Sequence, residues 1–303
     1  MNGHVGFIFP NIDPVLLQLG PLAIRWYALS YIAGLLLAWW GILRALRRSS
    51  LWAGPPFNGK PPATEDQIGD LLVWATFGVI LGGRLGWDLI YGTVLCSVSP
   101  DAGFCHGLPM AFLTNPLKII AAWEGGMSFH GGLLGVVIAI WLFCRRKKLN
   151  LLAVADLACA FAPIGLFFGR IANFINGELW GRVTEVPWAV TFCNLRIANL
   201  YGGFCPATNQ PRHPSQLYEA ATEGLLLLII LQICLRVFGL NRRPGLITAI
   251  FFLGYGVFRF ACEFFREPDA PFLGPVSMGM ALSIPIWLVA GALFVVSLRR
   301  PTP

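Results

Sequence analysis

Long runs of apolar residues, separated by short polar segments, dominate the sequence. A helix that crosses a bilayer needs about 20 mostly apolar residues, since each residue adds about 1.5 Å along its axis. Seven runs meet or approach this length: Leu22–Ala45, Ile68–Ile90, Met127–Cys144, Leu151–Phe168, Gln216–Val237, Leu246–Phe265 and Val276–Leu298. The pattern predicts an all-α, polytopic membrane protein of about seven transmembrane helices. Pro163 and Pro285 should kink or break their helices.

Composition supports this class and argues against a water-soluble fold. Of the 303 residues, 56% are hydrophobic and only 12% are charged, whereas a soluble domain carries about 25% charged residues. The net charge of +7 comes from short basic clusters between apolar runs. Such clusters are typical of topology signals and not of a nucleic-acid-binding face. We therefore expect membrane lipid as a partner and no nucleic acid.

The basic residues divide unequally between the two ends of the predicted helices. Thirteen lie on one side, including Arg145 to Lys148, and six lie on the other. Loops rich in basic residues stay in the cytoplasm, so the amino terminus is expected outside and the carboxy terminus inside. The chain, 1–303, is expected to form one integral-membrane domain with outer loops at about 92–126 and 176–214.

The eight cysteines follow no metal-binding spacing, and no nucleotide or metal motif occurs. The sequence therefore predicts no cofactor and no metal ion. Four cysteines fall as two pairs on the expected outer side, Cys96 with Cys105 and Cys193 with Cys205. An oxidising exterior allows disulfides there, and the sequence leaves open whether either pair is bonded.

Polar residues at membrane depth are the candidates for chemistry, because an ionisable group there is costly unless it is paired or faces water. The densest group is G169-R-I-A-N-F-I-N-G-E-L-W-G181. On a helix, Arg170 and Asn173 share a face, and Glu178 follows shortly after. The structural alternative is an arginine that reaches the interface beside capping asparagines.

A second group, G254-Y-G-V-F-R-F-A-C-E263, places Arg259 and Glu263 at positions i and i+4, where they can form an ion pair. That pair alone could be structural. On the expected topology, however, Arg259 lies at the depth of Arg170. Two guanidiniums at one level repel unless an anion bridges them, and a phosphodiester fits because arginine binds phosphate through two parallel hydrogen bonds.

The third group is E124-G-G-M-S-F-H-G-G132, in which His130 lies among glycines that allow a backbone or a ligand to approach closely. Imidazole titrates near neutral pH and can act as a general base, although a structural histidine is an equal alternative. Weaker signals are Tyr27, the Arg84–Asp88 spacing and R212-H-P-S-Q-L-Y-E219, in which Ser215 is expected to cap a helix.

Four segments together resemble the bacterial prolipoprotein diacylglyceryl transferase family. They are H130-G-G-L, the segment from G169 to G181, R212-H-P-S-Q-L-Y-E219 and F258-R-F-A-C-E-F-F-R-E-P-D269, and they match in this order. The resemblance covers most of the chain. The stretch Phe192–Thr208 aligns to no family motif.

The resemblance implies transfer of the sn-1,2-diacylglyceryl group from phosphatidylglycerol to the lipobox cysteine thiol of a preprolipoprotein, the first step of lipoprotein maturation. The products would be a thioether and glycerol 1-phosphate. The partners would be phosphatidylglycerol and the preprolipoprotein signal peptide, at a site near the outer leaflet of the bacterial cytoplasmic (inner) membrane. Implied catalytic residues are Tyr27, His130, Arg170, Glu178 and Arg259; implied phosphatidylglycerol-binding residues are Arg170, Asn173, Gly181, Arg259 and Glu263.

The residues suit that chemistry, because arginines can stabilise charge that develops on phosphate and a base can form the thiolate. The base could be His130 or a carboxylate, and the sequence does not decide between them. A transporter is the rival class, but its usual inverted repeats are not visible here. A structural scaffold would leave the embedded arginines unexplained.

Overall fold

A computed structural model describes residues 6–10, 12–13, 15–20, 22–89, 127–193, 210–267, 271–273 and 276–299. The chain divides into two compact units, Met1–Lys60 with Ala155–Pro303, and Pro61–Val154. Six helical segments of the described residues are long and apolar enough to cross a membrane, and a seventh, Leu246–Cys262, is shorter. The predicted all-α, polytopic membrane fold is confirmed. The expected outer loop at about 92–126 lies outside the described residues.

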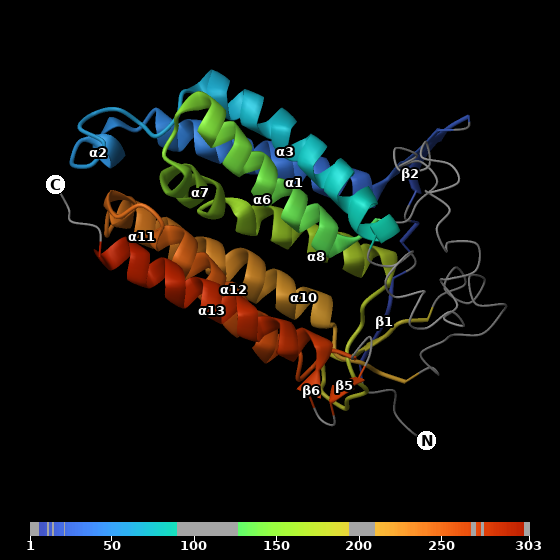
Figure 1. Cartoon of the computed structure of the whole chain (residues 1–303). Coiled ribbons are helices and arrows are strands. Elements are labelled where there is room, and N and C mark those ends of the chain that lie inside the picture. The colour runs from blue at the N-terminus through green and yellow to red at the C-terminus, as the bar shows by residue number, and fades with distance from the viewer. Residues whose placement is uncertain are drawn as a thin grey trace. The chain divides into compact units, whose positions relative to one another are not determined.

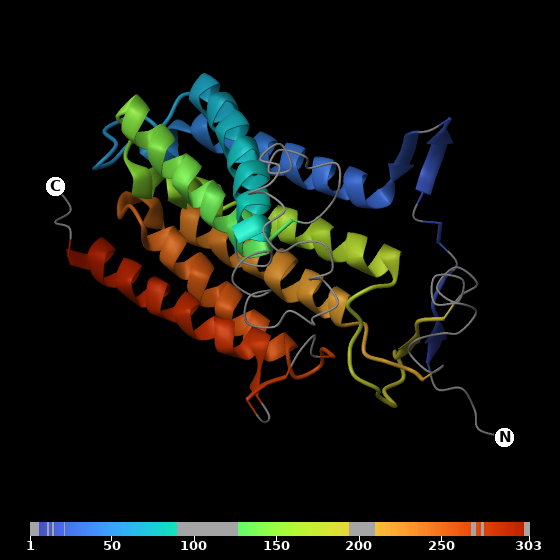
Figure 2. The ribbon, with the colours of Figure 1, turned by 45° about the vertical axis from the view of Figure 1, so that its right-hand side comes forward.

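The first unit is a group of helices that pack side by side. Its helices are α1 (Trp26–Leu46), α2 (Ser49–Trp52), α8 (Ala162–Asn176), α10 (Ser215–Glu219), α11 (Leu227–Arg236), α12 (Leu246–Cys262) and α13 (Met278–Arg299). A π-helical turn, Ala220–Leu226, joins α10 to α11, and a 3₁₀ turn, Leu240–Arg242, precedes α12. Helix α1 packs on α8, α8 on the π-helical turn, α11 on α12, and α12 on α13 (Figures 1 and 2).

Short strands gather at one end of these helices, which we call the strand end (Figure 1). They form three two-stranded sheets: β1 (Phe7–Ile8) with β4 (Val190–Thr191), β2 (Val15–Leu19) with β3 (Leu22–Arg25), and β5 (Pro271–Leu273) with β6 (Val276–Ser277). The β1–β4 pair is parallel and the other two are antiparallel. Helix α2 lies at the opposite end, where Asn241 donates a hydrogen bond to the Leu51 carbonyl at 2.8 Å.

Each predicted apolar run contains a helix, but several boundaries were wrong. The first helix begins at Trp26, because Leu22–Arg25 pairs with β2 as a strand. The run at Leu151–Phe168 is two helices, α7 (Leu151–Cys159) and α8, and α8 continues to Asn176. The break predicted at Pro163 is confirmed, since this proline lies in the first turn of α8. Helix α13 continues through Pro285 without a break.

The second unit is built on α3 (Glu65–Gly86) and α6 (Phe129–Lys147), which cross at a row of glycines. Gly78 and Gly82 of α3 face Gly135 of α6, and a Cβ atom placed on Gly82 would lie 2.8 Å from the Gly135 Cα. Contact this close requires residues without side chains. The glycines near His130 therefore serve the approach of one backbone to another. Helix α3 begins with a capping box made by Thr64 and Gln67.

A small aromatic core stabilises the strand end of the first unit. Phe9, Val190 and Phe192 are buried, and Phe174 and Trp180 pack against them. The rings of Phe9 and Phe174 meet edge to face with centroids 5.5 Å apart. This core ties the segment before α1 and the segment after α8 to the last turn of α8.

The outcome for the cysteines is partial. Cys193 is disulfide-bonded, but its expected partner Cys205 lies outside the described residues, as do Cys96 and Cys105. Among the described residues, the free cysteines are Cys144, Cys159, Cys234 and Cys262.

Candidate active site

Alternating helix directions bring the candidate residues of the first unit to the strand end. Tyr27 lies in the first turn of α1, Arg170 and Asn173 lie in the second half of α8, and Arg259 lies in the last turn of α12. Helices α8 and α10 are in contact, as are α10 and α12. Residues far apart in the sequence are thus gathered at one level of the bundle.

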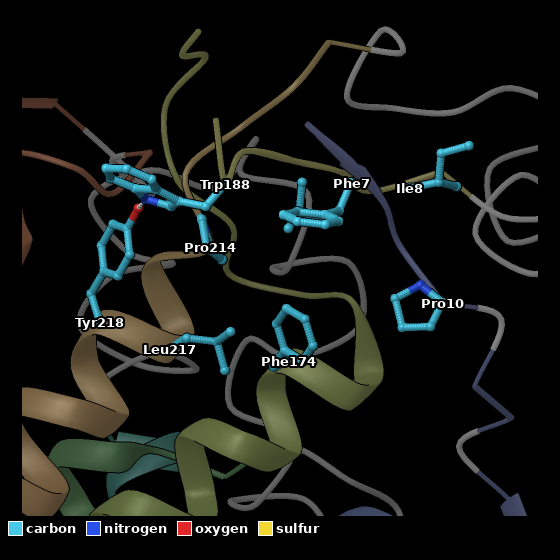
Figure 3. A pocket seen from close by; sticks show the side chains of 9 residues that line it. Phe7, Ile8, Pro10, Phe174, Trp188, Pro214, Leu217 and Tyr218 are labelled. Atoms are coloured by element: carbon cyan, nitrogen blue, oxygen red, sulfur yellow. Dashed lines mark hydrogen bonds between the residues drawn. The ribbon is translucent and has the colours of Figure 1, made fainter. Parts of the chain in front are cut away.

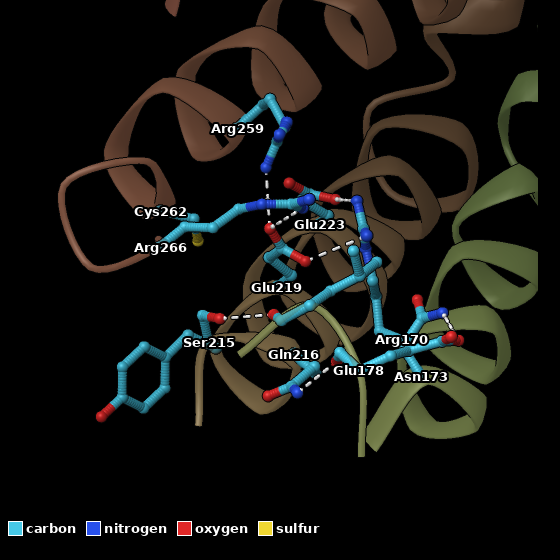
Figure 4. A network of polar contacts seen from close by, with 12 residues as sticks. Arg170, Asn173, Glu178, Ser215, Gln216, Glu219, Glu223, Arg259, Cys262 and Arg266 are labelled. Atoms are coloured by element: carbon cyan, nitrogen blue, oxygen red, sulfur yellow. Dashed lines mark hydrogen bonds and ion pairs between the residues drawn. The ribbon is translucent and has the colours of Figure 1, made fainter. Parts of the chain in front are cut away.

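The centre of this level is the carboxylate of Glu219, which is fully buried. Its Oε2 lies 3.1 Å from Nη1 of Arg170, and its Oε1 lies 2.7 Å from Nη1 of Arg259. A third guanidinium, that of Arg266, reaches Oε1 at 3.3 Å. Figure 4 shows the three arginines converging on this carboxylate. The anion expected between the two arginines is thus already supplied by a side chain of this protein.

Two more carboxylates complete the cluster. Glu223, also fully buried, lies 3.3 Å from Nη2 of Arg170. Glu263 lies 3.0 Å from Nη2 of Arg259, which confirms the predicted i, i+4 ion pair. Three guanidiniums thus face three carboxylates. Because the opposite charges are paired, the cluster avoids the cost of an unpaired buried charge. Removing one partner of a buried ion pair costs about 3–5 kcal/mol.

The arginines, unlike the carboxylates between them, remain reachable. The side chains of Arg170 and Arg259 are 17% and 15% exposed, against 0% for Glu219. A guanidinium has five N–H donors, and the ion pairs found among the described residues engage Nη1 and Nη2 of each. Donors therefore remain for an incoming anion.

A glycine on α13 makes room for Glu263. A Cβ on Gly279 would lie 2.7 Å from the carboxyl carbon of Glu263, so only glycine fits beside this buried side chain without a shift. Glu263 follows directly after α12 and is placed at the first turn of α13, where helical N–H groups favour negative charge. The Arg259–Glu263 pair therefore depends on the packing of two helices.

A sharp turn after α8 returns Glu178 to the helix. Gly177 adopts a left-handed conformation with φ of 66°, as does Leu179 with φ of 58°. The side-chain amide of Asn173 donates to Oε1 of Glu178 at 2.8 Å, and that of Asn176 donates to the same oxygen at 3.3 Å. Two amides therefore fix this carboxylate on the face of α8 that also carries Arg170.

The first turn of α10 holds the far side of the same loop. The Ser215 hydroxyl donates to the Leu179 carbonyl at 3.0 Å, and the Gln216 amide donates to the Glu178 carbonyl at 2.5 Å. The sequence predicts Ser215 as the cap of this helix, and that prediction is wrong. Ser215 is the first residue of α10, and the cap position is Pro214.

Gly181 lies where three segments meet. The Gly181 N–H donates to the His213 carbonyl at 2.9 Å, and Nη1 of Arg212 donates to the Gly181 carbonyl at 3.0 Å. A Cβ at this position would lie 2.6 Å from the His213 carbonyl oxygen. Its observed contacts position the loop after α8, whereas its expected contact with phosphatidylglycerol stays a prediction.

Tyr27 and His130 lie in different units. The Tyr27 hydroxyl is 3.1 Å from the Tyr31 hydroxyl, and Tyr27 is within electrostatic range of Glu178 and Arg170. His130 lies in the first turn of α6, in the second unit, beside Phe129 at a ring distance of 5.7 Å. The first unit thus gathers the matched residues other than His130.

Sequence reasoning missed Glu219 as the centre of the site and missed Glu223 altogether. In the sequence, Glu219 stands only at the end of one of the weaker motifs, R212-H-P-S-Q-L-Y-E219. A usable signal was present, since both carboxylates lie four residues apart within the apolar run Gln216–Val237. The rule that singled out Arg170, an ionisable residue at membrane depth, applies to them equally.

The fold and this cluster define a polytopic helical membrane protein whose arginines are held by buried carboxylates at one end of the bundle. The family model for prolipoprotein diacylglyceryl transferase matches residues 14–296. The chain therefore belongs to the prolipoprotein diacylglyceryl transferase family, as the sequence motifs predicted, and it is a transferase.

Curated relatives match along nearly the whole chain. Phosphatidylglycerol–prolipoprotein diacylglyceryl transferase of Caulobacter vibrioides is 49% identical over 304 residues, covering 97% of this chain and 96% of that protein. The enzyme of the same name from Rhodospirillum rubrum is 49% identical over 301 residues, with coverage of 97% and 95%. That of Rhizobium meliloti is 46% identical over 295 residues, with coverage of 94% and 93%.

Proposed function

We propose that this chain transfers the diacylglyceryl group from phosphatidylglycerol to the thiol of the lipobox cysteine in a preprolipoprotein. A sulfur–carbon bond forms at the diacylglyceryl carbon, and the bond from that carbon to the phosphate oxygen breaks. The phosphate keeps the electron pair and leaves as glycerol 1-phosphate, while the thiol proton passes to a base. The observation that carries this proposal is the pair of reachable guanidiniums anchored on Glu219.

The arginine cluster suits the leaving group. Negative charge grows on the phosphate as the carbon–oxygen bond breaks, and donors that are already oriented stabilise such charge most effectively. Glu219 and its partner carboxylates hold Arg170 and Arg259 in place before substrate arrives. The phosphate then meets N–H groups of fixed direction and not two mobile side chains.

The remaining matched residues take supporting roles in this proposal. Asn173, one turn after Arg170 on α8, is hydrogen-bonded to Glu178 in the turn that follows the helix, and together they can orient the glycerol part of phosphatidylglycerol. Tyr27 borders the same region from α1, and Gly181 positions the loop that follows α8. His130 is assigned as the base for the thiol from its residue chemistry.

We place the chain in the bacterial cytoplasmic (inner) membrane, with the strand end and the site near the outer leaflet. The support is the excess of basic residues at the opposite end of the helices, among them Arg44, Arg236 and Arg299 in the last turns of α1, α11 and α13. Such residues stay in the cytoplasm. The amino terminus would then lie outside and the carboxy terminus inside.

The test uses the purified full chain in vesicles that contain phosphatidylglycerol with a labelled acyl chain. A peptide with a lipobox cysteine should acquire the label, and glycerol 1-phosphate should appear in equal amount. The same peptide with serine in place of cysteine should acquire none. Label transfer to neither peptide by well-folded protein would reject the proposed activity.

A further inference from the structure

An apolar pocket lies at the strand end of the first unit, outside the arginine cluster. We propose that this pocket receives an apolar side chain of the polypeptide substrate, close in sequence to the cysteine that is modified. The proposal rests on the proposed function, because it concerns the second substrate of that reaction.

The walls of the pocket come from four segments of the chain. Phe7 belongs to β1, Phe174 to the last turn of α8, Trp188 to the segment before β4, and Leu217 and Tyr218 to α10; their side chains surround the space in Figure 3. The lining residues carry no charge. Their polar side-chain atoms pair with each other, since the Trp188 Nε1 donates to the Tyr218 hydroxyl at 2.6 Å. The pocket therefore favours an uncharged, apolar ligand.

Its walls are held by the folded core of the strand end. Phe174 packs against Phe9 and Phe192, and Val190 belongs to both the pocket and that core. The N–H of Phe7 donates to the Ala189 carbonyl at 2.7 Å, which fixes β1 along the rim. A pocket formed in advance loses little ordering entropy when a ligand binds.

The volume, about 370 Å³, fits a side chain better than a lipid. At about 30 Å³ for a group the size of water, the space holds roughly a dozen non-hydrogen atoms. One or two apolar side chains fill it, whereas the two acyl chains of a diacylglyceryl group exceed it. Most of the lining residues also lie beyond the ends of the helical spans. A polypeptide segment can lie there, whereas an acyl chain would have to leave the hydrocarbon region of the bilayer to reach it.

The pocket is within reach of the reacting centre. Phe174 directly follows Asn173, and Tyr218 directly precedes Glu219. Neighbouring residues of the same two helices, α8 and α10, therefore contribute to the pocket and to the arginine cluster. An extended chain advances about 3.3–3.6 Å per residue. A substrate whose thiol lies at the arginines can therefore place a side chain only a few residues away in the pocket.

Filling the pocket tests the proposal. Leu217→Trp occupies the space, and Leu225→Trp, at an exposed position of the same helical segment, is the matched control. For a peptide with an apolar residue near the cysteine, Leu217→Trp should raise the peptide KM about tenfold or more, the range for an obstructed hydrophobic contact. The KM for phosphatidylglycerol and the kcat should stay unchanged. A peptide with serine in place of that apolar residue should show the same KM with the wild-type enzyme and with Leu217→Trp.

A second measurement does not depend on this substitution. Peptides that carry a photoreactive leucine at each position around the cysteine in turn should crosslink to Phe174 or Leu217 from one position. Phe7→Ala enlarges the pocket at an exposed strand and should shift preference toward a larger side chain at that position.

The outcomes separate this proposal from the function on which it rests. A rise in the KM for phosphatidylglycerol in Leu217→Trp would assign the pocket to lipid and overturn the proposal. So would a normal peptide KM in that variant, or the absence of a crosslink to the pocket from every position. If wild-type protein modifies no peptide at all, the proposed function itself fails.

Discussion

Arg170 and Arg259 lie on different helices, yet each is paired with its own oxygen of one buried carboxylate, that of Glu219. Each guanidinium is held a second time, by Glu223 and Glu263 respectively. Two anchors fix both the position and the plane of a guanidinium, which a single contact does not. The relationship turns two separate arginines into one oriented pair.

Replacing either arginine by lysine should therefore abolish most activity. Lysine keeps the charge but loses the planar fork, so Arg170→Lys and Arg259→Lys should each lower turnover by roughly 10²-fold or more, the scale for one oriented donor. Label transfer in vesicles measures this. Arg236→Lys, an exposed arginine at the end of α11, should keep normal turnover. Wild-type transfer by both folded variants would make the arginines structural only.

Neutralising the shared carboxylate should affect stability as well as activity. Glu219→Gln leaves three guanidiniums with one anion fewer, and breaking a buried pair costs about 3–5 kcal/mol. We expect a lower Tm in detergent and loss of transfer. Glu267→Gln removes the partner of Arg212 at an exposed position and should change stability by about 1 kcal/mol or less. Equal Tm values for both variants would contradict the central role of Glu219.

The sequence predicted the class of fold because the hydropathy of a span depends only on local composition. It failed where strand and helix compete for the same apolar residues, as at Leu22–Arg25, which pairs with β2 and does not extend α1. It found Arg170 and Arg259 and expected a phosphodiester between them, whereas the carboxylate of Glu219 bridges them in the structure. That answer depended on which face of α10 meets α8, a tertiary relation that no spacing within one segment contains.

A methyl group on the glycine contact of the second unit should be destabilising. In Gly82→Ala the new Cβ would press on the backbone of α6 near Gly135, and overpacking of this kind costs about 1–3 kcal/mol. Gly69→Ala, on the same helix with no atom within 4 Å of the added Cβ, is the control and should be neutral or slightly stabilising. Thermal unfolding of both variants decides; a neutral Gly82→Ala would show that the helices can separate slightly at no cost.

Stability should depend modestly on pH because of His213, which lies in the loop before α10. Partial burial lowers the pKa of His213 below its ordinary value, so the folded state favours the neutral imidazole. The unfolded chain then binds more protons, and the stability contributed by this group is present above about pH 6.5 and lost as pH falls. The Tm difference between wild type and His213→Gln should be larger at neutral than at mildly acidic pH. A difference that grows on acidification would reverse the assignment.

The orientation can be tested independently of activity. A reporter fused after Pro303 should be active in the cytoplasm, and one inserted near Gly202 should be active outside, because the basic residues concentrate at the end of the helices that carries the carboxy terminus. The opposite result at either position would overturn the proposed topology.

The π-helical turn Ala220–Leu226 helps to keep the buried residues of this helical segment on one face. Glu219, Glu223, Leu227, Leu231 and Leu235 recur every four residues, and all are buried. In a regular α-helix each step of four overshoots a full turn by about 40°, so five such positions would spiral away from one face. The wider turn offsets part of this drift and keeps the charged and the apolar parts of the stripe on the same side. Deleting one residue from the turn would rotate α11 by about 100° against the two glutamates, so that either the leucines or the carboxylates would no longer face the interior of the bundle. Length at this point of the chain is therefore as constrained as residue identity.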